Sequence, residues 1–426
     1  MTLIEIFDRS PIENLASTIA LEPDQTIYIG TDVRRIQRAL PLYREILEGR
    51  GIRTDLVFRS AGKNDLEATL QVIDTILDER SDEPDEICVV DISGGDETLL
   101  LSVGLILGTR AEERRRLVAF RLNLFTRIAT YFLVRRDETG ELAVAREQQD
   151  FSSSGPHPLY LTVDENVLLH GGMITSRSET FTLSDPVCQD IDALWEVSRK
   201  DCVGWNAAIG KLSAEVSRYA DGNDLFAIPE ESLGTGKNKL SRDFFNQLVG
   251  RGLIKLRRTE SGLLIFNYKS RIVRECLTKS GSVLEYYTYK TALKMRENGR
   301  RVFDSVETGV VLDWDGQQNG TRNEIDVMMM RGVTPVFISC KNGDISVDEL
   351  YKIGAVADRF GADFARRALL STAFFDSQSK GFGGSGAANN MEDRARDMRI
   401  RPISCVHRLT ETEFAEALMK LAQYPG

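Results

Sequence analysis

The sequence predicts a mixed α/β protein with two α/β domains and a smaller module between them. The 426 residues exceed what one hydrophobic core usually organises. Short apolar runs alternate with amphipathic segments over the first third of the chain, and a second series of apolar runs begins after residue 276. We therefore expect domains at residues 1–136 and 276–426, joined by a connecting region at 137–275.

In the first domain, strand-like runs of 4–7 apolar residues are each followed by a helical segment. Such alternation predicts a parallel, doubly wound sheet whose binding edge lies at the carboxyl ends of its strands. The expected strands are TLIEIF, QTIYIG, RTDLVF, EICVVDI and RLVAFRL, and the expected helices follow Ser10 and occupy 33–51, 65–79 and 97–113.

The connecting region is more varied. Residues 137–185 are polar with Gly and Ser punctuation, which predicts irregular structure or a β-hairpin. Residues 240–268 read as a helix, a turn at Gly250–Gly252 and two strands around a second turn at Glu260–Gly262, which is the outline of a winged helix. The predicted helix carries few positive charges, so we favour a structural role over nucleic-acid recognition.

The last domain should begin with a helix at 282–299 and continue as strands and helices of a mixed sheet. The expected strands are 301–315, 323–332, 334–343, 367–375 and 402–407, and the expected helices are 347–361 and 391–400. The Gly- and Ser-rich segment 376–390 is expected to be a mobile loop. Asp344 and Asp348 are expected at a turn and at a helix N-terminus.

Two neighbouring strands of this domain carry the most informative residues. Side chains alternate along a strand, so Glu324 and Asp326 share one face of the first, and Ser339 and Lys341 share one face of the second. If the strands pair as a hairpin, the acids and the lysine meet at one end of the sheet. Carboxylates that hold Mg²⁺ or Mn²⁺ beside a cation form the group that phosphodiester hydrolysis requires.

This arrangement resembles the PD-(D/E)xK nuclease superfamily over roughly residues 280–410. The resemblance implies that Glu285, from the preceding helix, and Asp326 bind the metal, that Glu324 assists, and that Lys341 positions the water or the phosphate. The chain departs from the family at Ser339, where an acid is expected. The segment ISCKN, residues 338–342, is similar to the corresponding segment of nucleases fused to CARF domains in type III CRISPR systems.

Polar turns follow three strands of the first domain: Asp8–Pro11, Gly30–Asp32 and Asp91–Thr98. They should meet at one edge of the sheet and form a pocket. The third turn contains two adjacent glycines before a helix N-terminus, which lets backbone N–H groups approach a phosphate.

The order of these turns resembles a CARF domain, whose fourth strand ends in a loop similar to DISGG. The resemblance implies a homodimer that binds a cyclic oligoadenylate, most simply cyclic tetra-adenylate, across its two-fold axis. Asp96 and Glu97 stand where the family often has a basic residue. The residues implied to face the ligand are Ser10, Asn14, Thr31, Ser93, Gly94, Gly95 and Thr98.

We therefore predict a metal-dependent endonuclease that cleaves DNA and/or RNA in type III CRISPR antiviral defence and is activated by a cyclic oligoadenylate. The net charge of −10 is an objection, because nucleic-acid enzymes usually carry a basic footprint. The alternative is a CARF-linked transcription regulator with a degenerate nuclease domain. No apolar run spans a membrane, and an acidic N-terminal segment replaces a signal peptide, so we expect a cytoplasmic protein.

Overall fold

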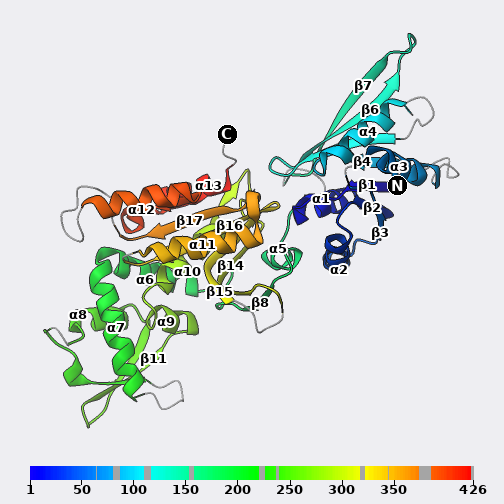
Figure 1. Ribbon diagram of the computed structural model, residues 1–426. Coiled ribbons are helices and arrows are strands. Elements are labelled where there is room, and N and C mark those ends of the chain that lie inside the picture. The colour runs from blue at the N-terminus through cyan, green and yellow to red at the C-terminus, as the bar shows by residue number, and fades with distance from the viewer. Residues whose placement is uncertain are drawn as a thin grey trace.

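The computed structural model describes residues 1–63, 65–79, 87–109, 117–152, 158–219, 226–236, 239–316, 322–343, 345–373 and 385–423. Figure 1 shows an elongated molecule with the N-terminal domain at one end, a second sheet in the middle and a small module at the other end. The predicted mixed α/β class is confirmed. No described helix is long and apolar enough to cross a membrane.

The N-terminal domain is built on a seven-stranded sheet of order β3-β2-β1-β4-β5-β6-β7, in which the first five strands are parallel. Helices cover both faces, so β1 and β4 are buried along their length. Leu3 packs towards α1 and α2, whereas its neighbour Ile4 packs towards α3 and α4. The elements are β1 (Thr2–Ile6), α1 (Pro11–Leu21), β2 (Gln25–Gly30), α2 (Val33–Gly49), β3 (Asp55–Ser60), α3 (Leu66–Glu79), β4 (Cys88–Asp91), α4 (Glu97–Thr109) and β5 (Leu117–Asn123).

The expected boundary at residue 136 is wrong. Strands β6 (Ile128–Arg136) and β7 (Leu142–Asp150) form a long antiparallel hairpin that continues the same sheet, so the N-terminal domain extends to about residue 150. The side chains of β7 are almost all exposed, and its sequence changes from the apolar LAVA to the polar REQQD, so it does not show the apolar–polar alternation of a half-buried strand.

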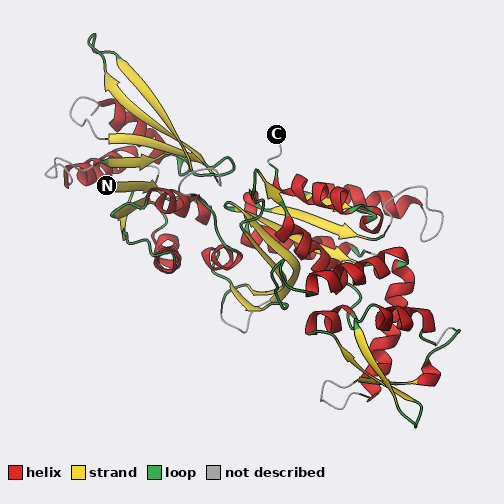
Figure 2. Cartoon of the chain, turned by 180° about the vertical axis from the view of Figure 1, so that it is seen from behind, coloured by secondary structure: helices red, strands yellow, loops and turns green. Residues whose placement is uncertain are grey.

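The connecting region contributes to two structures. Its first part contains α5 (Val163–Leu169) and β8 (Met173–Ser176), and β8 pairs with the C-terminal sheet. Its second part is the predicted winged-helix-like module, with a three-stranded sheet of order β10-β11-β9, which Figure 2 shows at the far end from the N-terminal sheet. The module's elements are α6 (Val187–Lys200), α7 (Cys202–Tyr219), β9 (Phe226–Pro229), α8 (Arg242–Gly250), β10 (Ile254–Arg258), β11 (Leu263–Tyr268) and α9 (Arg271–Cys276).

The C-terminal domain has a six-stranded sheet of order β18-β17-β16-β15-β14-β8. Strands β14 to β16 are antiparallel, and β16 to β18 are parallel. Helix α10 packs on one face of the sheet and α11 on the other. The elements are α10 (Ser282–Lys294), β14 (Ser305–Asp313), β15 (Arg322–Arg331), β16 (Thr334–Lys341), α11 (Val347–Phe360), β17 (Arg366–Ser371), α12 (Ser385–Asp397), β18 (Ile400–Ile403) and α13 (Glu411–Ala422).

The expected loop at 376–390 needs a correction. Residues 385–390 form the start of α12, and the residues before Ser385 in this segment lie outside the described part of the chain, as does Asp344.

Polar and aromatic contacts join the N-terminal domain to the C-terminal domain. Arg127, in the turn between β5 and β6, is only 6% exposed and lies 3.9 Å from Asp304. Its guanidinium also donates to the carbonyl of Leu159 at 3.2 Å. The ring of Phe125 lies 5.3 Å from that of Phe364, measured between centroids. The N-terminal and C-terminal domains are therefore in direct contact at the β5–β6 turn.

Candidate active site and ligand hollow

The β15–β16 hairpin opens at the residues that the sequence singles out. The two strands pair from Arg331 and Thr334 as far as Val327 and Ile338. Beyond that point a side chain replaces the backbone pairing between the strands: Asp326 Oδ2 accepts a hydrogen bond from the backbone N–H of Cys340 at 2.6 Å. This bond fixes the carboxylate of Asp326 at the end of the sheet.

Ser339 and Lys341 converge on the same carboxylate. The hydroxyl of Ser339 donates to Asp326 Oδ2 at 3.1 Å, and Lys341 Nζ lies 3.6 Å from that oxygen. Cys340 points to the opposite side, into the core beneath α10, as the predicted alternation requires. Burial of the ammonium group would lower the pKa of Lys341, but nearby Asp326 and Glu349 outweigh it and raise this pKa.

Glu285 reaches this end of the sheet from the first turn of α10. Burial raises its pKa well above the usual value, and the charges of Asp326 and Glu324 raise it further, while Lys341 opposes them. Glu324 itself is exposed at the rim.

Sequence reasoning missed two residues of this site. A narrow hollow of about 40 Å³ is lined by Asp326, Ser339 and Lys341 from the strands and by Glu349 and Lys352 from α11. Glu349 Oε2 lies 3.1 Å from Lys341 Nζ, and Glu349 Oε1 lies 3.2 Å from Lys352 Nζ. No direct signal in the sequence marks Glu349, since Ser346 and Glu349 have the spacing of an ordinary helix cap.

The donors at this end of the sheet are oxygen atoms, which suit Mg²⁺ or Mn²⁺. Among the residues that the structure describes, no three His, Cys, Asp or Glu side chains are grouped closely enough to hold a metal by themselves. Mg²⁺ usually keeps several waters and uses one or two carboxylates. Asp326 and Glu285, two carboxylates at the same end of the sheet, therefore fit such an ion.

A second hollow lies at the carboxyl edge of the N-terminal sheet, with a volume of about 800 Å³. The turns after β1 and β2 and the loop after β4 meet there, as predicted. Of the residues expected to face a ligand, Thr31 and Gly95 line it. The other lining residues are Phe7, Asp8, Arg9, Asp32, Val33, Arg34, Arg35, Lys63, Asp96, Glu97 and Leu99.

Several of the expected ligand-facing groups are engaged within the protein. Asn14 is 1% exposed, and its amide contacts Asp8, the carbonyl of Ser10 and the hydroxyl of Tyr43. The N–H of Gly95 donates to Asp8 Oδ2 at 2.9 Å. These bonds shape the turns rather than point into the hollow.

The remaining expected residues behave similarly. The N–H of Ser10 donates to Asp8 Oδ1, and the N–H of Thr98 donates to Asp96 Oδ1. The N–H of Ser93 donates to Asp91, while its hydroxyl accepts from the N–H of Leu122. Four basic side chains line the hollow beside four acidic ones: Arg9, Arg34, Arg35 and Lys63, with Asp8, Asp32, Asp96 and Glu97.

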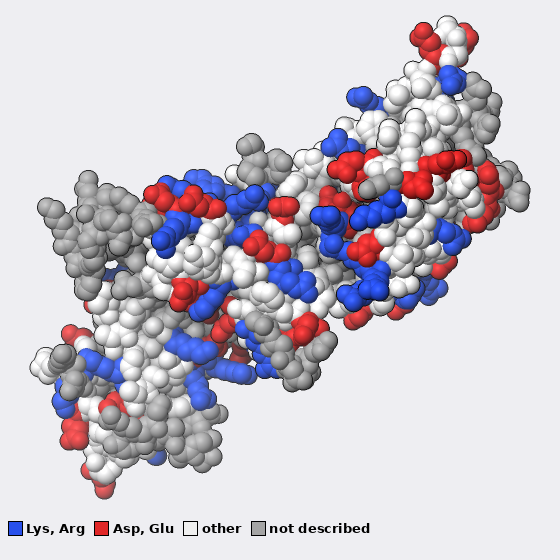
Figure 3. Space-filling model, in the orientation of Figure 1, with Lys and Arg blue, Asp and Glu red and all other residues white. Residues whose placement is uncertain are grey.

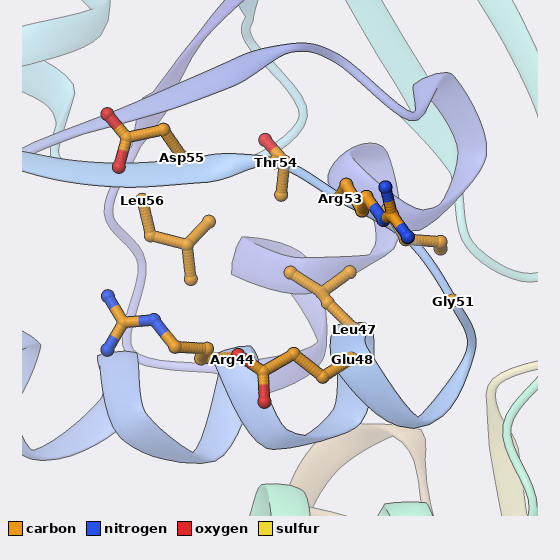
Figure 4. A pocket seen from close by; sticks show the side chains of 9 residues that line it. Arg44, Leu47, Glu48, Gly51, Arg53, Thr54, Asp55 and Leu56 are labelled. Carbon is orange, nitrogen blue, oxygen red and sulfur yellow. The ribbon is translucent and has the colours of Figure 1, made fainter.

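A third hollow, of about 630 Å³, lies between the end of α2 and the start of β3 (Figure 4). Its walls mix aliphatic side chains with charges of both signs, such as Arg44 and Glu48. None of its lining residues belongs to either predicted site, and it presents no group of catalytic side chains.

The comparisons with known proteins address the catalytic end of the chain. Residues 273–404 match the family model of the Card1-like endonuclease domain. This segment is similar to the endonuclease domain of Card1-like proteins. It contains Glu285, Asp326 and Lys341, and the expectation of a nuclease domain in this part of the chain is confirmed.

Two solved structures share the fold of nearly the whole chain. Protein VC1899 from Vibrio cholerae is 16% identical with a TM-score of 0.70, and the match covers 99% of this chain and 97% of that one. Can2 from Sulfobacillus thermosulfidooxidans, in complex with cyclic tetra-adenylate, is 14% identical with a TM-score of 0.63 and the same coverage. A comparison with curated proteins finds no match.

The visible face of the molecule is not uniformly basic. Figure 3 shows basic and acidic side chains interspersed over this face.

Proposed function

We propose that this chain is a metal-dependent endonuclease for DNA and/or RNA whose activity is switched on by a cyclic oligoadenylate. The observation that carries the proposal is the convergence of Asp326, Lys341 and Glu285 at one end of a Card1-like endonuclease sheet. The structural likeness to Can2, which was solved with cyclic tetra-adenylate, supports that class of activator.

At the catalytic end, Glu285 and Asp326 would hold Mg²⁺ or Mn²⁺, and a bound divalent ion supplies a Lewis acid and an acidified water. Lys341 lies beside Asp326 and would place its ammonium group against the scissile phosphate, where negative charge develops. Ser339 fixes Asp326 through its hydroxyl, and Glu324 stands at the rim where a strand would enter.

The N-terminal hollow would bind the messenger. Its volume, its opening to solvent and its four basic side chains suit a cyclic nucleotide with several phosphates. Arg34 and Arg35 lie in the first turn of α2, where the helix dipole adds to their positive charge. Thr31 and Gly95 line the same wall.

A second copy of the chain would complete this site through α4. This helix is apolar on all sides, and such helices are normally buried. Leu101 and Leu105 are nevertheless 55% and 42% exposed, and Gly104, on the same stripe, leaves room for a closely packed partner. Because α4 begins directly after the loop at Asp91–Asp96, pairing of two α4 helices would bring two hollows to one two-fold axis.

Activation would follow from the contacts between the domains. A messenger that binds one arrangement of the dimer more tightly shifts the population towards it. The buried Arg127 and the ring contact between Phe125 and Phe364 transmit such a change to the endonuclease domain.

A second candidate is a DNA-binding regulator that uses the winged-helix-like module. The exposed face of α8 carries Asn246 and Gln247, which are residue types that read base edges. Arg242 on the same helix, however, is paired with Glu230 at 3.6 Å. Tight, cleavage-independent binding of duplex DNA by the Asp326→Asn variant would favour this candidate.

The test is incubation of the full chain with plasmid DNA and with RNA, each with and without Mn²⁺ and cyclic tetra-adenylate. We expect cleavage only when both are present. Asp326→Asn and Lys341→Ala should each lower the rate by about 10²-fold or more, as for loss of a positioned electrostatic group, while calorimetry shows unchanged messenger binding. Full activity in both variants would place the chemistry elsewhere.

A further inference from the structure

We propose that Glu349, on α11, supplies the carboxylate that β16 lacks at Ser339, and that it is a metal-binding residue of the endonuclease site. This inference rests on the proposed metal-dependent function. It concerns a residue that lies on a different element, ten positions further along the chain than the serine it would replace.

Glu349 lies in the same hollow as Ser339. Ser339 is 8% exposed and contributes only a hydroxyl, which already donates to Asp326. Glu349 lines the same hollow from the opposite wall. Its Oε2 contacts Lys341 Nζ at 3.1 Å, and the same Nζ lies 3.6 Å from Asp326. One ammonium group therefore bridges the two carboxylates where a cation of higher charge could replace it.

Glu349 lies in the first turn of α11, where a glutamate often caps the helix. Ser346 and Glu349 have the spacing of a capping box, in which the glutamate returns to the N-cap backbone. The same spacing forms complete capping boxes at Thr162–Glu165 and at Thr410–Glu413. At α11, in contrast, the Ser346 side chain makes no capping hydrogen bond. Glu349 is directed to the lysines of the hollow, so the conventional structural role of this glutamate is not used.

Charged side chains of both signs surround the hollow. Glu324, Asp326 and Glu349 line it together with Lys341 and Lys352, and Glu285 approaches from α10. The three acids and two lysines that line the hollow leave one negative charge, and without Glu349 no net negative charge would be left there to attract a cation.

A positioning role is the rival explanation, in which Glu349 only aims Lys341. The two roles differ in what an acid at Ser339 would do. If Glu349 replaces the missing carboxylate, Ser339→Glu restores metal binding to a chain without Glu349. If Glu349 only orients Lys341, a glutamate on β16 cannot take over that task.

The experiment measures binding of Mn²⁺ to the full chain, without nucleic acid, from the loss of the electron paramagnetic resonance signal of free Mn²⁺. Glu349→Gln keeps the size of the side chain and should weaken Mn²⁺ binding about 10-fold or more. Asp348→Asn is the matched control, since Asp348 is exposed on the same helical turn and does not line the hollow. It should bind Mn²⁺ and cleave as the unmodified chain does. Thermal unfolding without metal checks that each variant is folded.

The outcomes separate this inference from the proposed function. The Ser339→Glu/Glu349→Gln double variant should regain Mn²⁺ binding. Undiminished binding in Glu349→Gln, or no recovery in the double variant, would overturn the role of Glu349 while leaving the endonuclease proposal intact. If Asp326→Asn also binds Mn²⁺ normally, the metal site itself is misplaced, and both proposals fail.

Discussion

Gly95 lies at the point where the β4–α4 loop passes over β1, and Gly95→Ala is a sharp test of that loop. Its φ angle is +115°, in a region that L residues rarely adopt. A Cβ there would lie 2.2 Å from Cγ2 and 2.9 Å from Cβ of the buried Ile6. The added methyl therefore meets the core of the sheet rather than the hollow, so the substitution acts first on the loop.

The cost can be worked from these two effects. An unfavourable positive φ costs about 1–2 kcal/mol, and overpacking against Ile6 costs about 1–3 kcal/mol. Together they destabilise the N-terminal domain by about 2–5 kcal/mol. For a domain of this size, each kcal/mol lowers Tm by about 2–4 °C. The loop must move away from Ile6, which also breaks the hydrogen bond from the Gly95 N–H to Asp8.

Gly94→Ala is the matched control. A Cβ at Gly94 would meet Asp8 at 3.4 Å, which is ordinary contact, and Gly94 has no positive φ. Thermal unfolding should therefore show a lowered Tm for Gly95→Ala and little change for Gly94→Ala. Calorimetry with cyclic tetra-adenylate should show weakened binding in Gly95→Ala. If Gly95→Ala unfolds and binds as the unmodified chain does, the strained loop is not a wall of the ligand hollow.

Three further predictions concern metal, pH and domain coupling. Cleavage should be faster in Mn²⁺ than in Mg²⁺ at equal concentration, because Asp326 is paired with Lys341 and a metal must compete with that ammonium group; equal half-saturation at micromolar levels in a metal titration would contradict this. Burial, followed by the charge of Asp8, raises the pKa of Glu13 to about 7, so unfolding should become easier as pH rises from the unfolded value of 4.5 towards 7. Glu13→Gln should therefore stabilise the chain at pH 8 but not at pH 4, by about 1 kcal/mol after solvent screening, and a pH-independent difference in Tm would refute it. Arg127→Met should lower the free energy of unfolding by about 3 kcal/mol, because it leaves Asp304 without its buried partner. In the same variant, cleavage should no longer depend on cyclic tetra-adenylate. Retained dependence would show that Arg127 does not couple the two domains.

Local pattern was enough to predict most of the elements and the central catalytic group. The buried strands β1 and β4 are apolar apart from Thr2, Glu5 and Asp91, because helices cover both faces of a parallel sheet. The alternation along β15 and β16 placed Asp326 and Lys341 on a shared end of the sheet, since side chains repeat every second residue in a strand. The missing acid at Ser339 was also visible in the sequence.

Tertiary structure decided the features that depend on distant partners. Strand β7 exists because its backbone pairs with β6, although its side chains are almost all exposed and its second half, REQQD, is polar. Asn14 was expected to face the ligand, but its amide is bonded to Tyr43 and to the turn after β1. Glu349 had the spacing of a helix cap, yet the opening of the β15–β16 hairpin directs it to Lys341. Sequence spacing fixes which residues share a face of one element, whereas the contacts of a side chain depend on which other element packs against that face.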